Sequence, residues 1–248
     1  MDYDDSQILG SETAKQGFEN EREVIARFNQ WHNDDTAKKW LQILGYEYDK
    51  IFSIRPGKVY GSFKADIFIE VNDKQNNSKV DYIQVKLVSN LRGYNQIDKR
   101  WIERYQELWK IPPDICHLLR LYTGELPPTA RGRDPRRMFA DEFNKVQQVE
   151  LCDFFEKNRD IIVKTIFQGD GEKRPEWLLV IQQLSRDAQW ALWPISKAME
   201  FFSSGNVSIT ERGNIRIGKI TVQRKGGDAG RETAKMLQFK INPAEILS

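Results

Sequence analysis

The sequence is poor in the residues that several kinds of site and scaffold require. It holds two cysteines, Cys116 and Cys152, and two histidines, His32 and His117, in 248 residues. Two cysteines do not make a disulfide framework, and so few cysteines and histidines do not indicate a zinc site. We therefore expect packed thiols in a reducing, cytoplasmic environment.

Long apolar runs are also missing. No run approaches the roughly 18 residues needed to span a bilayer, so no membrane partner is expected. The acidic start MDYDDSQ does not resemble a signal peptide. Charged residues make up 30% of the chain and hydrophobic residues 40%, a balance typical of globular proteins. The length suits one domain, 1–248.

The net charge of +2 is small, but it is unevenly distributed. Residues 92–110, 131–137 and 224–240 carry net charges of +2, +3 and +3, which leaves −6 for the remainder of the chain. Segregated lysine and arginine indicate a surface that binds a polyanion, although solvated helix faces give similar runs. The charge pattern alone leaves both interpretations open.

The hydrophobic periodicity predicts alternating helices and strands. An amphipathic helix is expected at 11–31, and Glu21 falls on its apolar stripe three residues after Phe18 and four before Ile25. Strands at 61–71 and 80–88 are expected to form a hairpin across NDKQNNSK. The other expected helices are 36–44, 98–110, 114–122, 138–157 and 195–203, the other strands are 48–54, 176–182, 207–210 and 215–224, and GRETAKMLQF at 230–239 reads as a helix or turn.

Two polar residues interrupt the apolar stretch YIQVKLVSN at 82–90. Strand side chains alternate between faces, so Gln84 and Lys86 should share one face while Ile83 and Val85 point into the core. A hairpin that turns around residue 75 places Asp66 opposite Gln84, and cross-strand Cβ atoms lie about 5 Å apart. An acid, an amide oxygen and a lysine would then meet in one patch.

These groups have a chemistry in common. Mg²⁺ binds carboxylate and carbonyl oxygens, so Asp66, the Gln84 amide and the Val85 backbone carbonyl are candidate ligands. The ion would polarise a phosphate, and Lys86 would orient water or stabilise negative charge in the transition state of phosphodiester hydrolysis. A half-exposed strand that carries Asp, Gln and Lys by chance would have the same pattern.

Longer blocks point to a family. Asp66 followed by QVK at 84–86 resembles the PD-(D/E)xK nuclease motif with Gln in place of the second acid, although Ala65 stands where the motif has proline. The chain also resembles small type II restriction endonucleases that cut G/C-only tetranucleotides of the GCGC or CCGG type. The blocks that carry this resemblance are TAKQGFENE (13–21), IQVKLVSNLRGYNQIDK (83–99), LYTGELPP (121–128), RRMF (136–139) and VQRKGGDAGRETAKMLQFKINP (222–243).

The resemblance implies a catalytic set of Asp66, Gln84 and Lys86, with Glu21 nearby on the first helix. It also implies Mg²⁺ as cofactor, double-stranded DNA as substrate and a cognate DNA methyltransferase as functional partner in a prokaryotic cytoplasm. A monomer and a homodimer both stay open.

Base reading is expected in the segment QRKGGDAGR. Glycines there can adopt backbone angles that let the chain approach DNA closely, and arginine, lysine and aspartate suit guanine and cytosine edges. A charged β-turn would have the same composition. Other arginines, at 131–137, are assigned to phosphates. The expected DNA-binding residues are Asn95, Gln96, Lys99, Arg136, Arg137, Gln223, Arg224, Lys225, Gly226, Gly227, Asp228 and Arg231.

The predicted fold is α/β, with a mixed central β-sheet flanked by helices and a smaller C-terminal β-rich portion that recognises DNA. The catalytic core is expected at about 11–130 and the recognition portion at about 190–248. The predicted function is Mg²⁺-dependent cleavage of double-stranded DNA at a short G/C palindrome, GCGC in the first instance. The alternatives are a mismatch or damage repair endonuclease, and a non-catalytic sequence-specific DNA-binding protein.

Overall fold

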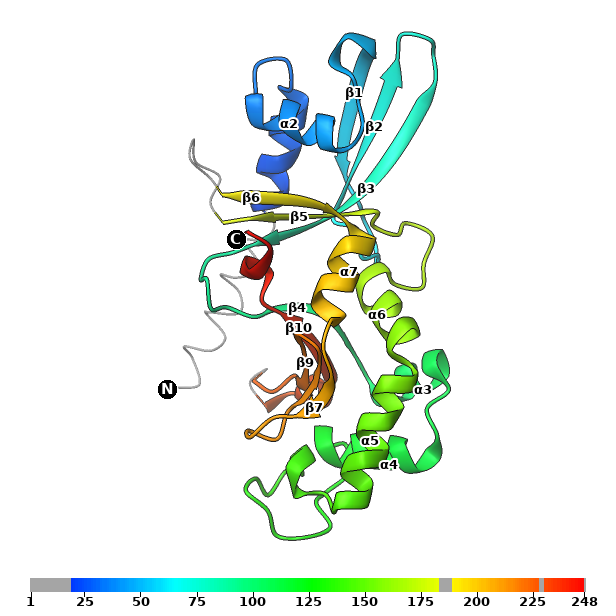
Figure 1. Cartoon of the computed structure of the whole chain (residues 1–248), viewed down its shortest axis with the longest axis vertical. Coiled ribbons are helices and arrows are strands. Elements are labelled where there is room, and N and C mark those ends of the chain that lie inside the picture. Colours follow the sequence, from blue (N-terminus) through cyan, green and yellow to red (C-terminus); the bar gives the residue numbers. More distant parts are fainter. Residues whose placement is uncertain (1–18, 183–188, 228–229, 248) are drawn as a thin grey trace. The chain divides into compact units, whose positions relative to one another are not determined.

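The computed structural model describes residues 19–182, 189–227 and 230–247 (Figure 1). The described chain divides into two compact units. The sheet A unit comprises 19–93, 168–182, 189–198 and 243–247, and the sheet B unit comprises 94–167, 199–227 and 230–242. The expected catalytic core at 11–130 thus draws on both units, because the chain enters the sheet B unit at Tyr94.

Sheet A contains five strands in the order β1-β2-β3-β5-β6. Only the β3–β5 pair is parallel, and the other pairs are antiparallel, so the sheet is mixed as predicted. The strands are β1 (Ile51–Lys58), β2 (Ile67–Asp73), β3 (Ser78–Leu87), β5 (Trp177–Ile181) and β6 (Trp190–Pro194).

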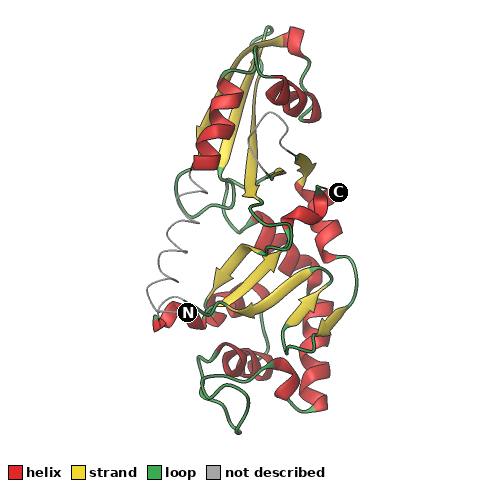
Figure 2. Ribbon diagram, turned by 90° about the vertical axis from the view of Figure 1, so that its left-hand side faces the viewer, coloured by secondary structure: helices red, strands yellow, loops and turns green. Residues whose placement is uncertain are grey.

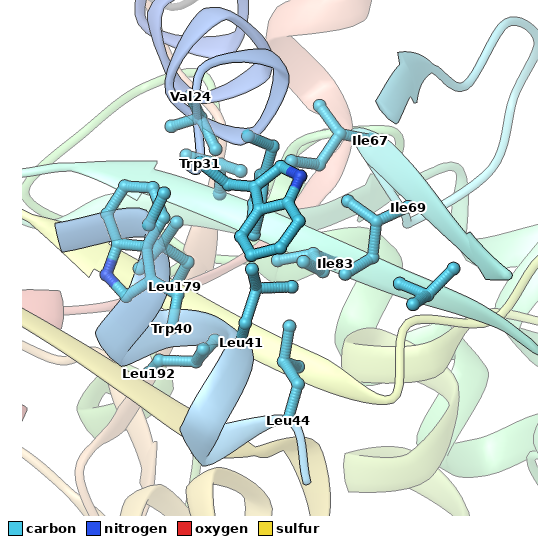
Figure 3. Packing of buried hydrophobic residues seen from close by; sticks show 14 of the residues in the cluster. Val24, Trp31, Trp40, Leu41, Leu44, Ile67, Ile69, Ile83, Leu179 and Leu192 are labelled. Atoms are coloured by element: carbon cyan, nitrogen blue, oxygen red, sulfur yellow. The ribbon is translucent and has the colours of Figure 1, made fainter. Parts of the chain in front are cut away.

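One face of sheet A is covered by residues 19–29, which are helical, and by α2 (Asp35–Ile43). Val24 and Trp40 from these helices are fully buried in one hydrophobic cluster with Ile67 and Ile83 of the sheet (Figure 3). Burial of each such side chain stabilises the fold by about 1.5–3 kcal/mol. Asp34 begins α2, since its carboxylate accepts a hydrogen bond of 2.9 Å from the Ala37 N–H group.

The β2–β3 hairpin has the register that the sequence predicts. Ile67 pairs with Ile83, which places Asp66 opposite Gln84 one step further along, and the Asp66 N–H group donates to the Ile83 carbonyl at 3.0 Å. Asp73 fixes the turn, because its carboxylate accepts hydrogen bonds of 2.8 Å from the N–H groups of Gln75 and Asn77. The chain therefore reverses around residue 75.

Sheet B is antiparallel throughout, with the order β4-β10-β9-β8-β7. Its strands are β4 (Asn95–Arg100), β7 (Val207–Ile209), β8 (Ile215–Ile217), β9 (Ile220–Arg224) and β10 (Leu237–Ile241). The helices of the chain after α2 are α3 (Ile102–Trp109), α4 (Pro113–Thr123), α5 (Lys145–Lys157), α6 (Arg159–Gln168) and α7 (Ile195–Ser203).

Helices and aromatic rings form the core of the sheet B unit. Helices lie beside the strands of this sheet (Figure 2). α5 contacts β7 and β8, and α4 contacts β9. Tyr105 and Trp109 of α3 stack at 4.3 Å between ring centroids, and the edges of both rings meet Phe239 of β10. Together the two sheets and their helices make an α/β fold with a C-terminal β-rich portion.

Several predicted elements are wrong. Residues 98–100 belong to β4, because Asp98 is buried in the sheet and accepts a hydrogen bond of 2.8 Å from the Tyr105 hydroxyl. The helix expected at 138–157 begins only at Lys145, where Asn144 caps it. In the segment 230–239, the expected helix or turn is found as a 3₁₀ turn at 232–235, but the prediction is wrong from Leu237 on, where β10 begins. β6 and α6 were not predicted.

Within the described residues, further 3₁₀ turns lie at Tyr48–Lys50, Ala140–Glu142 and Pro243–Ile246. Among the helices in the described part of the chain, none combines the length and apolar character that a membrane span requires.

Candidate active site and DNA-binding surfaces

Asp66, Gln84 and Lys86 come together just before the start of β2 and near the end of β3. Gln84 and Lys86 pair with Leu178 and Val180 of the parallel strand β5, and both of these neighbours are fully buried. Gln84 itself is only 3% exposed. The interpretation of a half-exposed strand with chance polar residues therefore does not fit Gln84, which lies in a strand covered on both faces.

The Gln84 amide is buried without a full set of hydrogen bonds. Its Nε2 donates to the Lys64 carbonyl at 3.2 Å, but its Oε1 has no hydrogen-bond partner among the described residues. Asp81, on the same strand, shows the usual case: its carboxylate accepts from Tyr46 and from Trp177 and pairs with Lys79. A buried acceptor that lacks a partner requires an explanation, such as a bound ion.

The Asp66 carboxylate lies beside Gln84. One of its oxygens, Oδ2, accepts a hydrogen bond of 2.7 Å from the Val85 N–H group. Burial raises the pKa of Asp66, while the positive charge of Lys86, the Val85 hydrogen bond, and the charges of Lys58 and Lys64 act in the opposite direction. The carboxylate is therefore held in an environment that disfavours its charge, and a cation would relieve this cost.

The Val85 carbonyl points to the side of β3 on which Asp66 lies. The carbonyl of Tyr82 bonds to the Glu176 N–H group beside β5, whereas that of Ile83 bonds to Asp66 on the β2 side. Backbone groups alternate along a strand, so the carbonyl of Val85 also points to the β2 side, at a level that β2 does not reach because it begins at Ile67 opposite Ile83. Three oxygen donors are thus available: one Asp66 carboxylate oxygen, Gln84 Oε1 and the Val85 carbonyl.

This donor set contains a single acid. Within the described ranges, no three His, Cys, Asp or Glu side chains are grouped so that they could hold a metal ion. A hard cation such as Mg²⁺ also accepts amide and backbone carbonyl oxygens and keeps several waters, so the three oxygens fit it as a partial ligand set. The residues present therefore fit a hard divalent cation and do not fit zinc.

Glu21 forms an ion pair with Lys58 of β1, with 2.6 Å between Oε2 and Nζ. Lys58 is one of the three lysines that lower the pKa of Asp66, so Glu21 is connected to the site through this lysine. Glu19, Glu21, Arg22, Ile25, Gly57, Lys58 and Tyr60 line a pocket of about 630 Å³. The described contact of Glu21 is thus with Lys58, and its role at the site stays a prediction.

The expected base-reading and phosphate-binding arginines line one pocket of about 500 Å³ in the sheet B unit. Arg136 and Arg137 were assigned to phosphates from the sequence, and Arg224 and Arg231 to bases, yet the four residues converge there. The pocket is lined by Asp134, Arg136, Arg137, Arg224, Gly226, Gly227, Gly230, Arg231, Ala234 and Lys235. The arginines assigned to bases and those assigned to phosphates thus lie together, and which of them contact bases stays a prediction.

Two of these arginines are held in place. The Arg137 guanidinium lies 3.9 Å from the centre of the Phe139 ring, and Arg224 Nε donates to the Ala234 carbonyl at 3.1 Å. Burial lowers the pKa of both guanidinium groups, and the charge of Arg224 lowers that of Arg137 further. Both groups stay charged, so an anionic or hydrogen-bond-accepting ligand would offset their desolvation and mutual repulsion.

Glycines shape the wall of this pocket. Gly124 ends α4 with a φ of 79°, and a Cβ atom there would lie 2.5 Å from the Arg136 carbonyl and 3.1 Å from Arg224 Nη1. Gly226 and Gly227 have φ values of 64° and 58°, with no heavy atom within 4 Å of an added Cβ. The last two glycines therefore have the backbone angles expected from the sequence and leave open space for a ligand.

The remaining expected DNA contacts lie elsewhere. Gln223 is next to Arg224 in β9, so its side chain projects from the opposite face of sheet B. Gln96 and Lys99 share that face, where they pair with Lys240 and Gln238 of the neighbouring strand β10. Asn95 pairs with Ile241 and projects from the other face. Lys225 is half-buried, and its N–H group donates to the Met236 carbonyl at 2.8 Å. Asp228 lies outside the described residues.

A family model of the R.HinP1I restriction endonuclease matches residues 44–247, which include the Asp66, Gln84 and Lys86 site and sheet B. The chain belongs to this family. It is therefore a type II restriction endonuclease, a site-specific deoxyribonuclease that acts on DNA. Among curated proteins, no relative matches the sequence.

The fold has a relative among solved structures. A crystal structure of the restriction endonuclease MspI in complex with its cognate DNA matches with a TM-score of 0.60 and 17% sequence identity. The match covers 83% of this chain and 77% of that chain. At this identity the likeness concerns the fold, and it agrees with the α/β architecture described above.

Proposed function

We propose that this restriction endonuclease hydrolyses both strands of double-stranded DNA at a short G/C palindrome, GCGC, with Mg²⁺ held by Asp66, Gln84 and the Val85 carbonyl. The observation that carries the metal assignment is the buried, unpartnered Oε1 of Gln84 beside the Asp66 carboxylate. When bound, Mg²⁺ supplies positive charge that offsets the negative charge developing on the scissile phosphate. Restriction endonucleases generally use a divalent metal ion, which agrees with this assignment.

The protein's own side chains have separate roles in this proposal. Asp66 and Gln84 bind the metal ion and fix its position, because Asp66 is held by the Val85 N–H group and Gln84 by the Lys64 carbonyl. Lys86 projects from the same face as Gln84 and donates to an oxygen of the scissile phosphate or to the attacking water. Glu21 orients Lys58 through their ion pair and so adjusts the field at Asp66.

Specificity for guanine and cytosine is proposed to come from the pocket around Arg224 and Arg137. A guanidinium group can donate two parallel hydrogen bonds to O6 and N7 of guanine, an arrangement that a lysine cannot reproduce. Arg136 forms a two-bond ion pair with Asp134, at 2.9 Å for each bond, and this pair lowers the pKa of Asp134 to about 2. The rim of the pocket is thus fixed before DNA arrives.

Replacing an arginine of this pocket by lysine keeps the positive charge but removes the forked hydrogen-bonding geometry of the guanidinium group. Arg224→Lys and Arg137→Lys should each cost about 1–3 kcal/mol on a GCGC duplex and reduce discrimination against duplexes with one base pair changed. The salt dependence of binding should change little, since each variant keeps its positive charge. Binding is measured by fluorescence anisotropy with Ca²⁺ in place of Mg²⁺.

The matched control is Arg104→Lys on α3, an exposed arginine paired with Glu107, which should bind like the wild type. If either pocket variant lowers the affinity for all duplexes by one common factor, that arginine contacts phosphate, and its assignment to base reading is wrong.

Plasmid digestion tests the proposed activity. With Mg²⁺ the enzyme should cut unmodified plasmid into discrete fragments whose ends map to GCGC, and EDTA should abolish cutting. A plasmid methylated at GCGC should resist, because a four-base site recurs throughout any genome and the host would need a cognate methyltransferase. Fragment ends at another sequence would contradict the GCGC assignment, and cutting only at mismatched or damaged pairs would contradict restriction.

A further inference from the structure

A second buried amide, far from Gln84 in the sequence, also lacks a partner. Gln238 in the middle of β10 is 5% exposed, and its Oε1 has no hydrogen-bond partner among the described residues. Its Nε2 donates to Gln96 Oε1 at 2.6 Å. An amide can be turned end for end without changing its shape, so one polar atom of Gln238 is left over in either orientation. Such an atom destabilises the fold unless a ligand satisfies it.

Lys240, two residues along the same strand, presents a similar case. It is half-buried, burial alone lowers its pKa, and it makes no salt bridge with any side chain in the described ranges. Lysine is unfavourable at the centre of a sheet, where a threonine or valine would pack without loss of hydration. Lys240 and Gln238 therefore put two costly polar side chains on one face of one strand.

The strand next to β10 is bent so that its polar residues join this face. Lys99 pairs with Gln238 and Gln96 pairs with Lys240, with a β-bulge between them. Residues three apart in a regular strand project to opposite faces, and the bulge is what places Gln96 and Lys99 on the same face. Bulges of this kind are typical of sites where a side chain must be re-aimed.

The face continues across β9 and β8. Gln223 pairs with Gln238, Thr221 pairs with Lys240, and Arg216 pairs with Thr221. Arg216 donates to the Tyr94 hydroxyl at 2.9 Å, and Tyr94, Arg216, Thr221, Gln223 and Lys240 contribute to the lining of a pocket of about 590 Å³. The helices α4 and α5 contact the same sheet, and its buried apolar residues, such as Val222 and Phe239, lie on the face opposite these polar ones.

We propose that this polar face of sheet B binds the DNA duplex, with Lys240 on a backbone phosphate and Gln238, together with Gln96, on a base edge. The proposal rests on the proposed function and adds a surface distinct from the arginine pocket. It explains why cations and amides are mixed there: cations contact phosphates without regard to sequence, and amides read base edges. A small anion would need only the cations.

The test compares Lys240→Met, Gln238→Leu and the control Lys157→Met. Lys157 lies on α5, where its side chain is 76% exposed, so its replacement removes the same charge from the same unit. The probes are two labelled 24-base-pair duplexes, one with a central GCGC and one without, in Ca²⁺ at several salt concentrations. Melting temperatures are measured for every variant.

Lys240→Met should bind both duplexes about tenfold more weakly, with a salt slope reduced by about 1. Gln238→Leu should lose about 5-fold to 100-fold on the GCGC duplex and little on the other. Lys157→Met should match the wild type. Both test variants should melt at the wild-type temperature or higher, because each removes a polar group whose burial is not compensated in the free protein.

The outcomes distinguish a failure of DNA binding by the polar face from a failure of the proposed function. If Lys240→Met keeps wild-type affinity and salt slope, the polar face does not bind DNA, while the arginine pocket and the catalytic site are unaffected. If Gln238→Leu weakens both duplexes equally or neither, its assignment to a base edge is wrong. If the wild type binds both duplexes equally, the GCGC assignment fails, and Lys240→Met still decides whether DNA lies on this face.

Discussion

Replacement of Lys86 by alanine is expected to reduce the rate of DNA cleavage by at least about 10²- to 10³-fold, the usual effect of removing one group that stabilises transition-state charge. Lys86 shares a face with Gln84, and its charge is close enough to lower the pKa of Asp66. Because it is assigned to the transition state, GCGC binding in Ca²⁺ should stay within a few-fold of the wild type. Single-turnover cleavage and anisotropy measure the two effects separately.

Two further variants make this result interpretable. Lys86→Met keeps the aliphatic part of the side chain, so it should lose cleavage as alanine does while retaining the packing. Lys50→Ala removes the same charge from the same unit at an exposed position paired with Glu47, and it should cut normally. A Lys86→Met enzyme that cuts within tenfold of the wild-type rate would show that the catalytic lysine has been assigned incorrectly.

The proximity of Asp66 and Gln84 was predictable because it is local. A hairpin that turns near residue 75 relates Asp66 to Gln84 by counting alone, and the observed register agrees. The burial of Gln84 was not predictable in this way. It depends on β5 and on Leu178, which join β3 from a distant part of the sequence, so nothing near residue 84 indicates that both faces of the strand are covered.

The expected DNA-binding residues show the same limit. In the sequence, the helices α5, α6 and α7 and the strands β5 to β8 lie between Arg137 and Arg224. Both arginines nevertheless line one pocket, because α4 ends at Gly124 beside β9. Residues that are neighbours in the sequence also need not share a face of the sheet. Gln223 and Arg224 project from opposite faces of β9, and only the bulge in β4 brings Gln96 and Lys99 to one face. Which side chains share a face therefore depends on strand registers that join distant segments of the chain.

Gln238 and Lys240 were missed for a related reason. Leu237, Phe239 and Ile241 alternate with them as buried residues, which is the pattern of a half-buried strand. The segment GRETAKMLQF was instead interpreted as a helix or turn, because the good helix formers at its centre outweighed the short alternation that follows. The alternation that predicts the strand runs from Leu237 to Ile241 and so continues past the end of this segment.

Replacement of Asp66 by asparagine is expected to abolish cleavage and, at the same time, to raise the melting temperature of the free protein. The asparagine Oδ1 can still accept the Val85 N–H hydrogen bond, whereas the buried negative charge is gone. Burial is the largest influence on this carboxyl and raises its pKa despite three neighbouring lysines, so the ionised form destabilises the fold. Calorimetry of both proteins without divalent ions measures the difference.

The pH dependence of this difference has a definite sign. An unfolded aspartate titrates near pH 3.9, and folded Asp66 titrates above that value. Between the two pKa values the folded protein binds more protons than the unfolded chain, so the stability of the wild type falls as pH rises. The advantage of Asp66→Asn should therefore be absent below about pH 4, grow above it, and become constant once folded Asp66 is ionised.

Asp81 provides the opposing control in the same sheet. It is 1% exposed, but its carboxylate pairs with Lys79 and accepts a hydrogen bond of 3.1 Å from Trp177, so Asp81→Asn should lower the melting temperature. Mg²⁺ should then distinguish the two sites: it should stabilise the wild type and Asp81→Asn, and leave Asp66→Asn unchanged. If Asp66→Asn melts below the wild type at pH 8, or is stabilised by Mg²⁺ as strongly, the carboxylate is a structural group and the metal is held elsewhere.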